Sequence, residues 1–286
     1  MTPMLRPLLC TALLLSAGPA WAAPALWTVS DADSKILLFG SVHILPGDFE
    51  WRTERFDQAL RKVDTVMFET DVSAAAQATV SAEAFARGIY TDGTLLTDVL
   101  DDAQEARIRA AAAEYDLPFG PLLAMRPWMA AGMIANAAMA RAGFTDIGVE
   151  GQLLPELGDK TMAYLETNMF QLDLLTGSDD AEDAADLVRV LDGMADFPTQ
   201  IDSLLAHWVD GQSDGLLDML VDQMVGDEEM IDTIIYQRNQ NWIAPIEALL
   251  ADNELTLIVV GAAHLLGDKG VPALLEAKGY RVERIE

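Results

Sequence analysis

The chain has 286 residues, with 18 Lys and Arg against 46 Asp and Glu, so its formal net charge is −28 and its sequence pI is near 4.1. Hydrophobic residues make up 51% of the chain, which excludes a disordered or fibrous protein. Because phosphate groups are bound by a Lys/Arg-rich face, we expect no nucleic-acid partner, and the same charge disfavours an anionic lipid surface.

The first 22 residues have the pattern of a secretory signal peptide. A basic residue, Arg6, precedes a short apolar run, and the small-x-small sequence Ala20-Trp21-Ala22 follows. The strongly apolar part is only about ten residues long, whereas a membrane-spanning helix needs ~20. We therefore expect cleavage after residue 22, a secreted or periplasmic protein without stable membrane insertion, and one α/β domain over residues 23–286. The single cysteine, Cys10, leaves with the signal, so no disulfide scaffold is expected.

The order of the predicted elements at the start of the chain indicates an α/β fold. Two strands are expected at residues 25–29 and 35–40, joined by a turn. A helix beginning near Arg52 and a third strand at 65–69 follow. This strand–helix–strand alternation favours a central sheet that is mostly parallel or mixed.

The rest of the chain predicts a large helical middle followed by further strands. Residues from about 74 to 226 are rich in Ala, Leu, Asp and Met and predict helices, with one strand at 161–166. The expected C-terminal elements are, in order, a long helix at 228–250, a strand at 255–260, a helix near 271–278 and a strand at 280–285. We expect the N- and C-terminal strands to share a single sheet.

Two of the three histidines occur in the same local pattern. Residues 37–45 (LLFGSVHIL) and 259–266 (VVGAAHLL) each combine an apolar strand, a glycine, two small or apolar residues and a histidine. Because ligands of open α/β sheets bind at the carboxyl ends of strands, His43 and His264 are expected to project into such a site. A converging pair of imidazoles suits a divalent metal, or an acid and a base on opposite sides of one substrate.

Glu69 ends the third predicted strand, where a buried carboxylate is costly unless it is paired, hydrogen-bonded or metal-bound. With His43 and His264 it would form a two-His-one-carboxylate ligand set that leaves positions open for water and substrate. If Glu69 is not a ligand it becomes the general base, and the remaining alternative is that it begins a solvated loop. Nitrogen and oxygen donors without a thiolate make Mn²⁺, Co²⁺ or Zn²⁺ the candidate metals. Glu166 and then Glu150 are the reserve ligands.

Six segments of the chain together resemble the TraB/GumN family, which includes the animal Tiki Wnt-cleaving proteases. The segments are Gly40-Ser41-Val42-His43, Phe68-Glu69, Arg126-Pro127-Trp128, Leu165-Glu166-Thr167 with Gln171, Gln237-Arg238-Asn239 and Gly261-Ala262-Ala263-His264-Leu265. The resemblance spans the chain after the signal and implies a metal-dependent hydrolase, with the paired Gly-x-x-His motifs and Glu69 as active-site groups. A more distant similarity to erythromycin-esterase and haem-binding ChaN-like folds implies a shared architecture with different chemistries.

The resemblance also implies roles for Arg238 and Asn239. An arginine aimed into the site would hold a substrate carboxylate or stabilise an oxyanion, and Asn239 would orient a ligand or the attacked carbonyl. We therefore predict an exported metal-dependent hydrolase that acts on peptide or amide bonds, with a peptide or small molecule of neutral or basic character as substrate. One alternative is a metal-independent esterase-type hydrolase in which His43 and His264 are acid and base. The other is a non-catalytic periplasmic binder of a peptide or haem.

Overall fold

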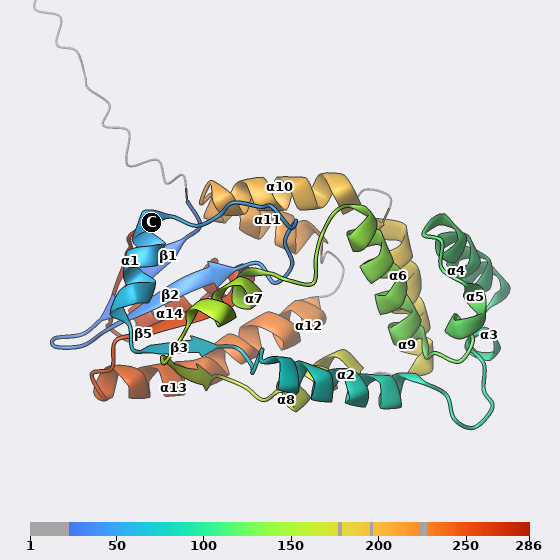
Figure 1. The fold of residues 1–286 in the computed structure, drawn as a ribbon, viewed down its shortest axis with the longest axis horizontal. Helices are drawn as coiled ribbons and strands as arrows, with labels where there is room; N and C mark the ends of the chain where they lie inside the picture. Colours follow the sequence, from blue (N-terminus) through green and yellow to red (C-terminus); the bar gives the residue numbers. More distant parts are fainter. Residues whose placement is uncertain (1–22, 177–178, 195–196, 224–227) are drawn as a thin grey trace, which may run out of the picture.

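The structure is a computed structural model that describes residues 23–176, 179–194, 197–223 and 228–286. The signal peptide predicted for residues 1–22 lies outside this part. A sheet occupies one end of an elongated molecule, and helices extend from it to the other end (Figure 1). The α/β fold with a large helical middle is therefore confirmed.

The sheet is mixed and contains six strands in the order β4-β3-β5-β2-β1-β6. The strands are β1 (Leu26–Ser30), β2 (Lys35–Ser41), β3 (Thr65–Phe68), β4 (Thr161–Tyr164), β5 (Thr256–Gly261) and β6 (Arg281–Arg284). β4, β3, β5 and β2 run parallel, whereas β1 is antiparallel to both β2 and β6. The N- and C-terminal strands thus share one sheet, as the sequence predicted, because β5 inserts between β3 and β2.

Helices cover the sheet and continue beyond it. In chain order they are α1 (Glu54–Lys62), α2 (Ala74–Gly88), α3 (Leu96–Val99), α4 (Asp102–Glu114), α5 (Phe119–Leu122), α6 (Pro127–Arg141), α7 (Val149–Leu153), the 3-10 turn η1 (Leu154–Glu156), α8 (Asn168–Thr176), α9 (Asp180–Gly193), α10 (Phe197–Val209), α11 (Ser213–Gln223), α12 (Glu228–Ile231), the π-helical segment η2 (Asp232–Tyr236), α13 (Gln237–Ala251), the 3-10 turn η3 (Ala262–Leu265) and α14 (Val271–Ala277). Among the described residues, no helix is both long enough and apolar enough to cross a membrane.

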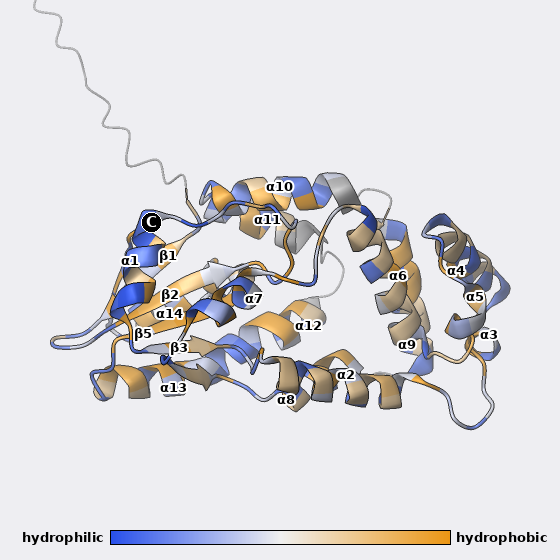
Figure 2. Ribbon diagram, in the orientation of Figure 1, coloured by the Kyte–Doolittle hydropathy of each residue, from blue (hydrophilic) through white to orange (hydrophobic). Residues whose placement is uncertain are grey.

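The buried side chains form one cluster on each face of the sheet and a third cluster among the helices beyond the sheet. Side chains alternate along β2, so Leu37 and Phe39 pack with residues of α1, α7 and α10, while Ile36 and Leu38 pack with α13 and α14. α4, α6 and α9 bury the third cluster around Ile134. Figure 2 shows the hydrophobic colours on β2 and β5 and hydrophilic colours over much of α1, consistent with a sheet buried on both faces.

The helix predicted for residues 228–250 is present, and it contains a π-helical turn that was not predicted. α12 ends at Ile231, η2 follows in a π-helical conformation, and regular α-helix resumes at Gln237. π-Helical turns inside helices often occur at functional sites, and this one immediately precedes Arg238. The spacing of apolar residues does not reveal the one extra residue of a π-helical turn, because the apolar pattern continues through it. The sequence therefore predicted a regular helix.

Candidate active site

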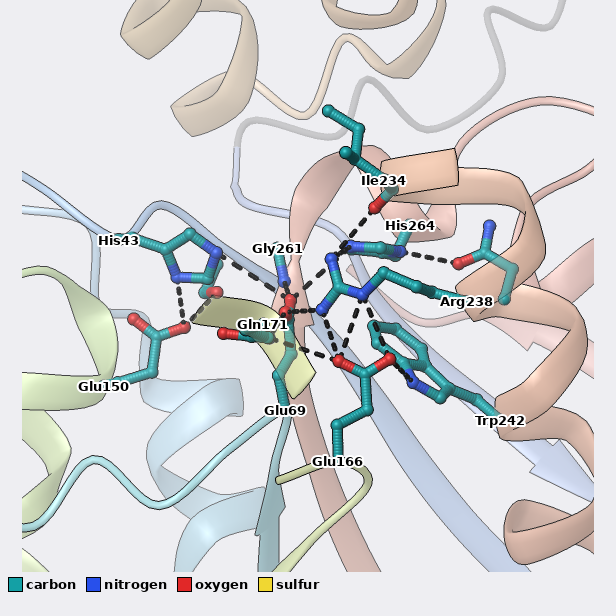
Figure 3. A network of polar contacts seen from close by, with 12 residues as sticks. His43, Glu69, Glu150, Glu166, Gln171, Ile234, Arg238, Trp242, Gly261 and His264 are labelled. Atoms are coloured by element: carbon teal, nitrogen blue, oxygen red, sulfur yellow. Dashed lines mark hydrogen bonds and ion pairs between the residues drawn. The ribbon is translucent and has the colours of Figure 1, made fainter. Parts of the chain in front are cut away.

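The register of the sheet brings the two Gly-x-x-His segments side by side. β2 and β5 pair in parallel with Gly40 opposite Val260 and Ser41 opposite Gly261, so His43 and His264 both follow the same edge. β3 pairs with the other side of β5, and Glu69 follows its last residue. The three side chains approach one another at the carboxyl edge of the sheet (Figure 3).

The Glu69 carboxylate lies at the centre of this group. Its Oε1 accepts a hydrogen bond from the Gly261 N–H at 2.7 Å and lies 3.8 Å from His43 Nε2 and 3.7 Å from His264 Nε2. Its Oε2 lies 2.5 Å from Nη2 of Arg238. Burial alone would raise the pKa of Glu69, but the charges of the two histidines and of the arginine, with the Gly261 hydrogen bond, lower it to about 2. Glu69 is therefore an ionised carboxylate at neutral pH.

His43 is held by Glu150, on the first turn of α7. Nδ1 of His43 lies 3.0 Å from Oε1 of Glu150, which also accepts a hydrogen bond from the Ser41 hydroxyl. Desolvation opposes protonation of His43, but the charge and the hydrogen bond of Glu150, helped by Glu69, raise its pKa to about 9. The side chain is 59% exposed, so its Nε2 edge is accessible from outside the protein.

His264 is buried and has partners on both ring nitrogens. Nδ1 lies 2.6 Å from Oδ1 of Asn239, whose Nδ2 donates to the Lys269 carbonyl at 2.9 Å. Nε2 lies 3.1 Å from Nη1 of Arg238, and the Trp242 ring packs 4.3 Å away, centroid to centroid. Because an arginine only donates hydrogen bonds, the ring is neutral, with its proton on Nδ1. Desolvation and the Arg238 charge lower the pKa of His264 to about 4 against the pull of Glu69.

Arg238 is fixed by a second carboxylate, Glu166. Its Nε donates to Oε1 of Glu166 at 3.0 Å, and its Nη2 donates to Oε2 at 2.8 Å, a two-pronged arrangement that matches the planar guanidinium. The Trp242 indole N–H also donates to Glu166 at 2.8 Å. The Glu166 N–H donates to the Glu69 carbonyl at 2.8 Å, continuing the pairing of β3 with β4. The two glutamates are therefore neighbours across the sheet.

Two glycines leave the space that these side chains occupy. A Cβ on Gly261 would lie 3.0 Å from His43 Nε2 and 3.3 Å from Glu69 Oε1. A Cβ on Gly148 would lie only 2.1 Å from the backbone carbonyl of His43, a distance at which neither atom could remain in place. The backbones of His43 and of the α7 N-terminus therefore approach as closely as they do only because residue 148 has no side chain.

Two cavities meet at this site. One, of about 440 Å³, is lined largely by aliphatic side chains of α8, α10, α11 and η2. The other, of about 460 Å³, is lined by polar side chains that include Gln77, Ser81 and Asp146. His43, Glu69 and Gln171 border both cavities. A substrate that crosses from one cavity to the other would pass these three side chains.

The profile of the TraB/PrgY/gumN family matches residues 25–284.

The chain belongs to the TraB/PrgY/gumN family.

A segment of 60 residues is 37% identical to a protein described as "Metalloprotease TIKI homolog" from Amphimedon queenslandica. This match spans 20% of the chain and 12% of that relative. No solved structure matches the chain significantly. The family resemblance inferred from the six sequence segments is therefore confirmed.

The predicted site residues of this TraB/PrgY/gumN protein all lie in one network. His43, Glu69, His264 and Arg238 lie within 4 Å of at least one other member, and Asn239 contacts His264 from behind. The reserve residues take other positions: Glu150 pairs with His43, and Glu166 pairs with Arg238.

Sequence reasoning missed the contacts of three further side chains. Ser41 donates to Glu150, Gln171 donates to Oε2 of Glu69 at 3.0 Å, and Trp242 binds Glu166. Ser41 lies inside the first Gly-x-x-His motif and Gln171 accompanies the Leu-Glu-Thr motif, so both belong to the segments that carry the family resemblance. Trp242 follows Arg238 by one helical turn, and that spacing is the only sequence signal for its position.

The donor chemistry of this TraB/PrgY/gumN site fits a divalent metal, provided that Arg238 moves away from His264 Nε2. Two imidazole Nε2 atoms face one carboxylate oxygen, and each Nδ1 is held by a carboxylate or carbonyl oxygen, as is usual behind metal-bound histidines. Within the described part of the chain, however, no group of three or more His, Cys, Asp or Glu side chains is placed to hold a metal ion. The Arg238 guanidinium lies against His264 Nε2, so a metal at this nitrogen has to displace that contact.

Proposed function

We propose that this protein is an exported, metal-dependent hydrolase of peptide or amide bonds, with His43, His264 and Glu69 as ligands of Mn²⁺, Co²⁺ or Zn²⁺. One observation carries the proposal: two histidine Nε2 atoms face the same Glu69 oxygen, at 3.8 and 3.7 Å, with each ring fixed through Nδ1. The signal-like pattern of residues 1–22 supports export. The partial match to a protein described as a metalloprotease supports the reaction class.

The bound ion would supply a water of lowered pKa and polarise the attacked carbonyl. Hydrolysis adds water across the amide bond: the C–O bond forms, the C–N bond breaks, and the leaving nitrogen takes a proton. Glu69, with a pKa of about 2, is ionised and can act as ligand or as base for the water proton. A metal-bound His43 has no proton on Nε2, so the leaving nitrogen takes the proton that Glu69 accepts from the water when Glu69 acts as the base.

Arg238 and Asn239 have different roles in this proposal. Arg238 lines the apolar cavity, and its guanidinium stays charged, so it can stabilise negative charge that develops on the carbonyl oxygen. Asn239 is fully buried and contacts His264 and the Lys269 carbonyl, so it acts as a positioning residue for His264. This burial favours the role of orienting a ligand over that of holding the attacked carbonyl.

A metal-independent hydrolase is the second candidate, and the position of Arg238 favours it. The guanidinium contact at His264 Nε2 leaves that nitrogen engaged without a metal. His43, with a pKa raised to about 9 by Glu150, would be protonated at neutral pH and would serve as the general acid. Glu69 would then orient the water or accept its proton.

Hydrolysis of fluorescein-labelled casein by the purified protein tests the proposal. We expect activity with Mn²⁺, Co²⁺ or Zn²⁺ that disappears after exhaustive chelation and returns when metal is restored. Glu69→Gln and His43→Ala should abolish it, whereas His207→Ala, a histidine hydrogen-bonded to Gln212 outside the site, should retain it. Activity that survives chelation would favour the metal-independent candidate. Binding of peptides without any cleavage would contradict both and identify a binder.

A further inference from the structure

We propose that the substrate is an extended peptide with a bulky apolar side chain on one side of the scissile bond and a cationic segment on the other. This inference rests on the proposed function, because it assumes that the bond is cleaved at the His43–Glu69 site. It follows from the different linings of the two cavities that meet there.

The apolar cavity has the character of a subsite for a large hydrophobic side chain. Leu174 and Leu175 of α8, Ile201 and Leu204 of α10, and Ile234 of η2 contribute aliphatic groups to its wall. Leu175 is 67% exposed, so an apolar surface faces outward at the rim of this cavity. A volume of about 440 Å³ lies within the range of pockets that bind small molecules or side chains. An aliphatic or aromatic residue would bury this surface, whereas a charged one would lose its hydration against the aliphatic wall.

The second cavity differs from the first mainly in polarity and charge. Thr70, Gln77 and Ser81 supply hydroxyl and amide groups to its wall, and Asp146 supplies a carboxylate. Glu69 is paired with Arg238 and Glu150 is paired with His43, but Asp146 is exposed and forms no ion pair within the part of the chain that the structure describes.

Among the described residues Asp146 is therefore a carboxylate of this cavity without an ion-pair partner, and a Lys or Arg side chain would complement it. The net charge of −28 would also attract a cationic peptide and repel an acidic one.

The position of the cleaved bond follows from the side chains that the cavities share. His43, Glu69 and Gln171 border both. A chain that occupies both cavities has to lie against His43 and Glu69, because both side chains line both cavities. The substrate residues on either side of the cleaved bond would then lie in different cavities, one apolar and one polar. Both residues would therefore determine which peptides are cleaved.

Binding and cleavage of labelled peptides test this inference separately from the proposed function. The probes are fluorescein-labelled octapeptides of Gly and Ser with one central pair: Leu-Lys, Lys-Leu, Ser-Lys or Leu-Glu. Binding is measured by fluorescence anisotropy in EDTA, and cleavage is measured by mass spectrometry with Mn²⁺. We expect one of the two Leu/Lys orders to bind at least about tenfold more tightly than Ser-Lys. We expect it to bind about two- to fivefold more tightly than Leu-Glu.

Substitutions at the cavity walls provide the matched controls. Asp146→Lys should reverse the preference for Lys over Glu, whereas Asp159→Lys, the same charge change at an exposed residue that lines neither cavity, should leave it unchanged. Leu204→Gln should reduce the Leu-over-Ser preference about tenfold. Leu175→Asp should reduce it in the same direction at an exposed position that does not threaten folding.

Equal binding of all four peptides, or preferences that none of the wall variants alters, would overturn the inference. Selective binding without cleavage would leave the inference standing and contradict the proposed hydrolase. Cleavage of all four peptides at equal rates would contradict the inference about the substrate and support the proposed hydrolase.

Discussion

Nη1 of Arg238 lies 3.1 Å from Nε2 of His264, the nitrogen that a metal would use. The other ring nitrogen is engaged by Asn239, so the ring is held in one orientation and one tautomer. Metal binding at His264 and the contact with Arg238 are therefore alternatives. The Arg238 contact holds the imidazole in its neutral form, so a metal can bind Nε2 only when this contact is broken.

The depressed pKa of His264 predicts a loss of stability in acid. The pKa is about 4 in the folded protein, below the ordinary value of 6.5, so the unfolded chain takes up a proton first as the pH falls. The contribution is fully present above pH 6.5 and is lost as the pH falls through about 4, to a total of about 3 kcal/mol. Urea unfolding of the metal-free protein at several pH values should therefore show the free-energy gap between wild type and His264→Asn narrowing below pH 6.5. A gap that is independent of pH would contradict this account of His264.

His43 has the opposite dependence. Its folded pKa is raised from 6.5 to about 9, so its stabilising contribution is fully present below pH 6.5 and is lost as the pH rises through about 9. His43→Ala should therefore differ from wild type more at pH 6 than at pH 10 in the same unfolding series. If the difference increased with pH instead, the pairing of His43 with Glu150 would be wrong.

Glu166→Gln should weaken the network behind the site. The buried Arg238 would lose its two-pronged partner, and we expect unfolding to become easier by about 2–4 kcal/mol. Glu247→Gln is the matched control, because Glu247 pairs with Lys278 at the surface and should contribute less than about 1 kcal/mol. Equal losses in the two variants, measured by urea unfolding, would show that Glu166 does not support Arg238.

Gly148→Ala should both destabilise the protein and disturb His43. The added Cβ would lie 2.1 Å from backbone atoms of His43, which cannot rotate away, and such overpacking costs about 1–3 kcal/mol or more. Gly132→Ala is the control, since that glycine lies inside α6 with nothing within 4 Å of its added Cβ. It should stabilise the protein by about 0.5–1 kcal/mol. The thermal unfolding temperatures of the two variants are compared. A Gly148→Ala variant as stable as wild type would contradict the close approach of residue 148 to the His43 backbone.

Glu150→Gln should reduce function more than it reduces stability. The variant keeps the size of the side chain but removes the charge that raises the pKa of His43. Removing a group that hydrogen-bonds a metal-bound histidine typically lowers metal affinity or activity about 10–100-fold. We therefore expect kcat/KM to fall by about this factor. Glu156→Gln removes a surface carboxylate paired with Arg52 and should leave kcat/KM unchanged. Full activity of the Glu150→Gln variant would show that Glu150 does not support the function of His43.

The fold and the site differ in how far the sequence could predict them. The apolar runs at both ends of the chain predicted the strands because period and composition are local properties, and the repeated Gly-x-x-His pattern placed His43 and His264 at one edge. The sequence did not reveal that Glu150, 107 residues after His43, would be its partner, because that contact depends on how α7 docks.

The roles of Glu166 and Arg238 also depend on long-range packing. Sequence reasoning ranked Glu166 as the first reserve ligand because it closes a strand as Glu69 does, but β4 ends at Tyr164 and the Glu166 side chain turns to Arg238. The π-helical turn before Arg238 likewise depends on tertiary packing, which overrides the regular helical period.

Metal content distinguishes a metal site at His43 and His264 from metal-free acid–base chemistry. The purified protein, incubated with Mn²⁺, Co²⁺ and Zn²⁺ without an affinity tag that binds metal, would be analysed by elemental mass spectrometry beside His43→Ala, His264→Ala and the control His207→Ala. We expect close to one equivalent of metal in wild type and His207→Ala, and loss of the metal in the other two variants. No bound metal in wild type under any of these conditions would contradict the metal site and leave His43 and Glu69 as a metal-free acid and base.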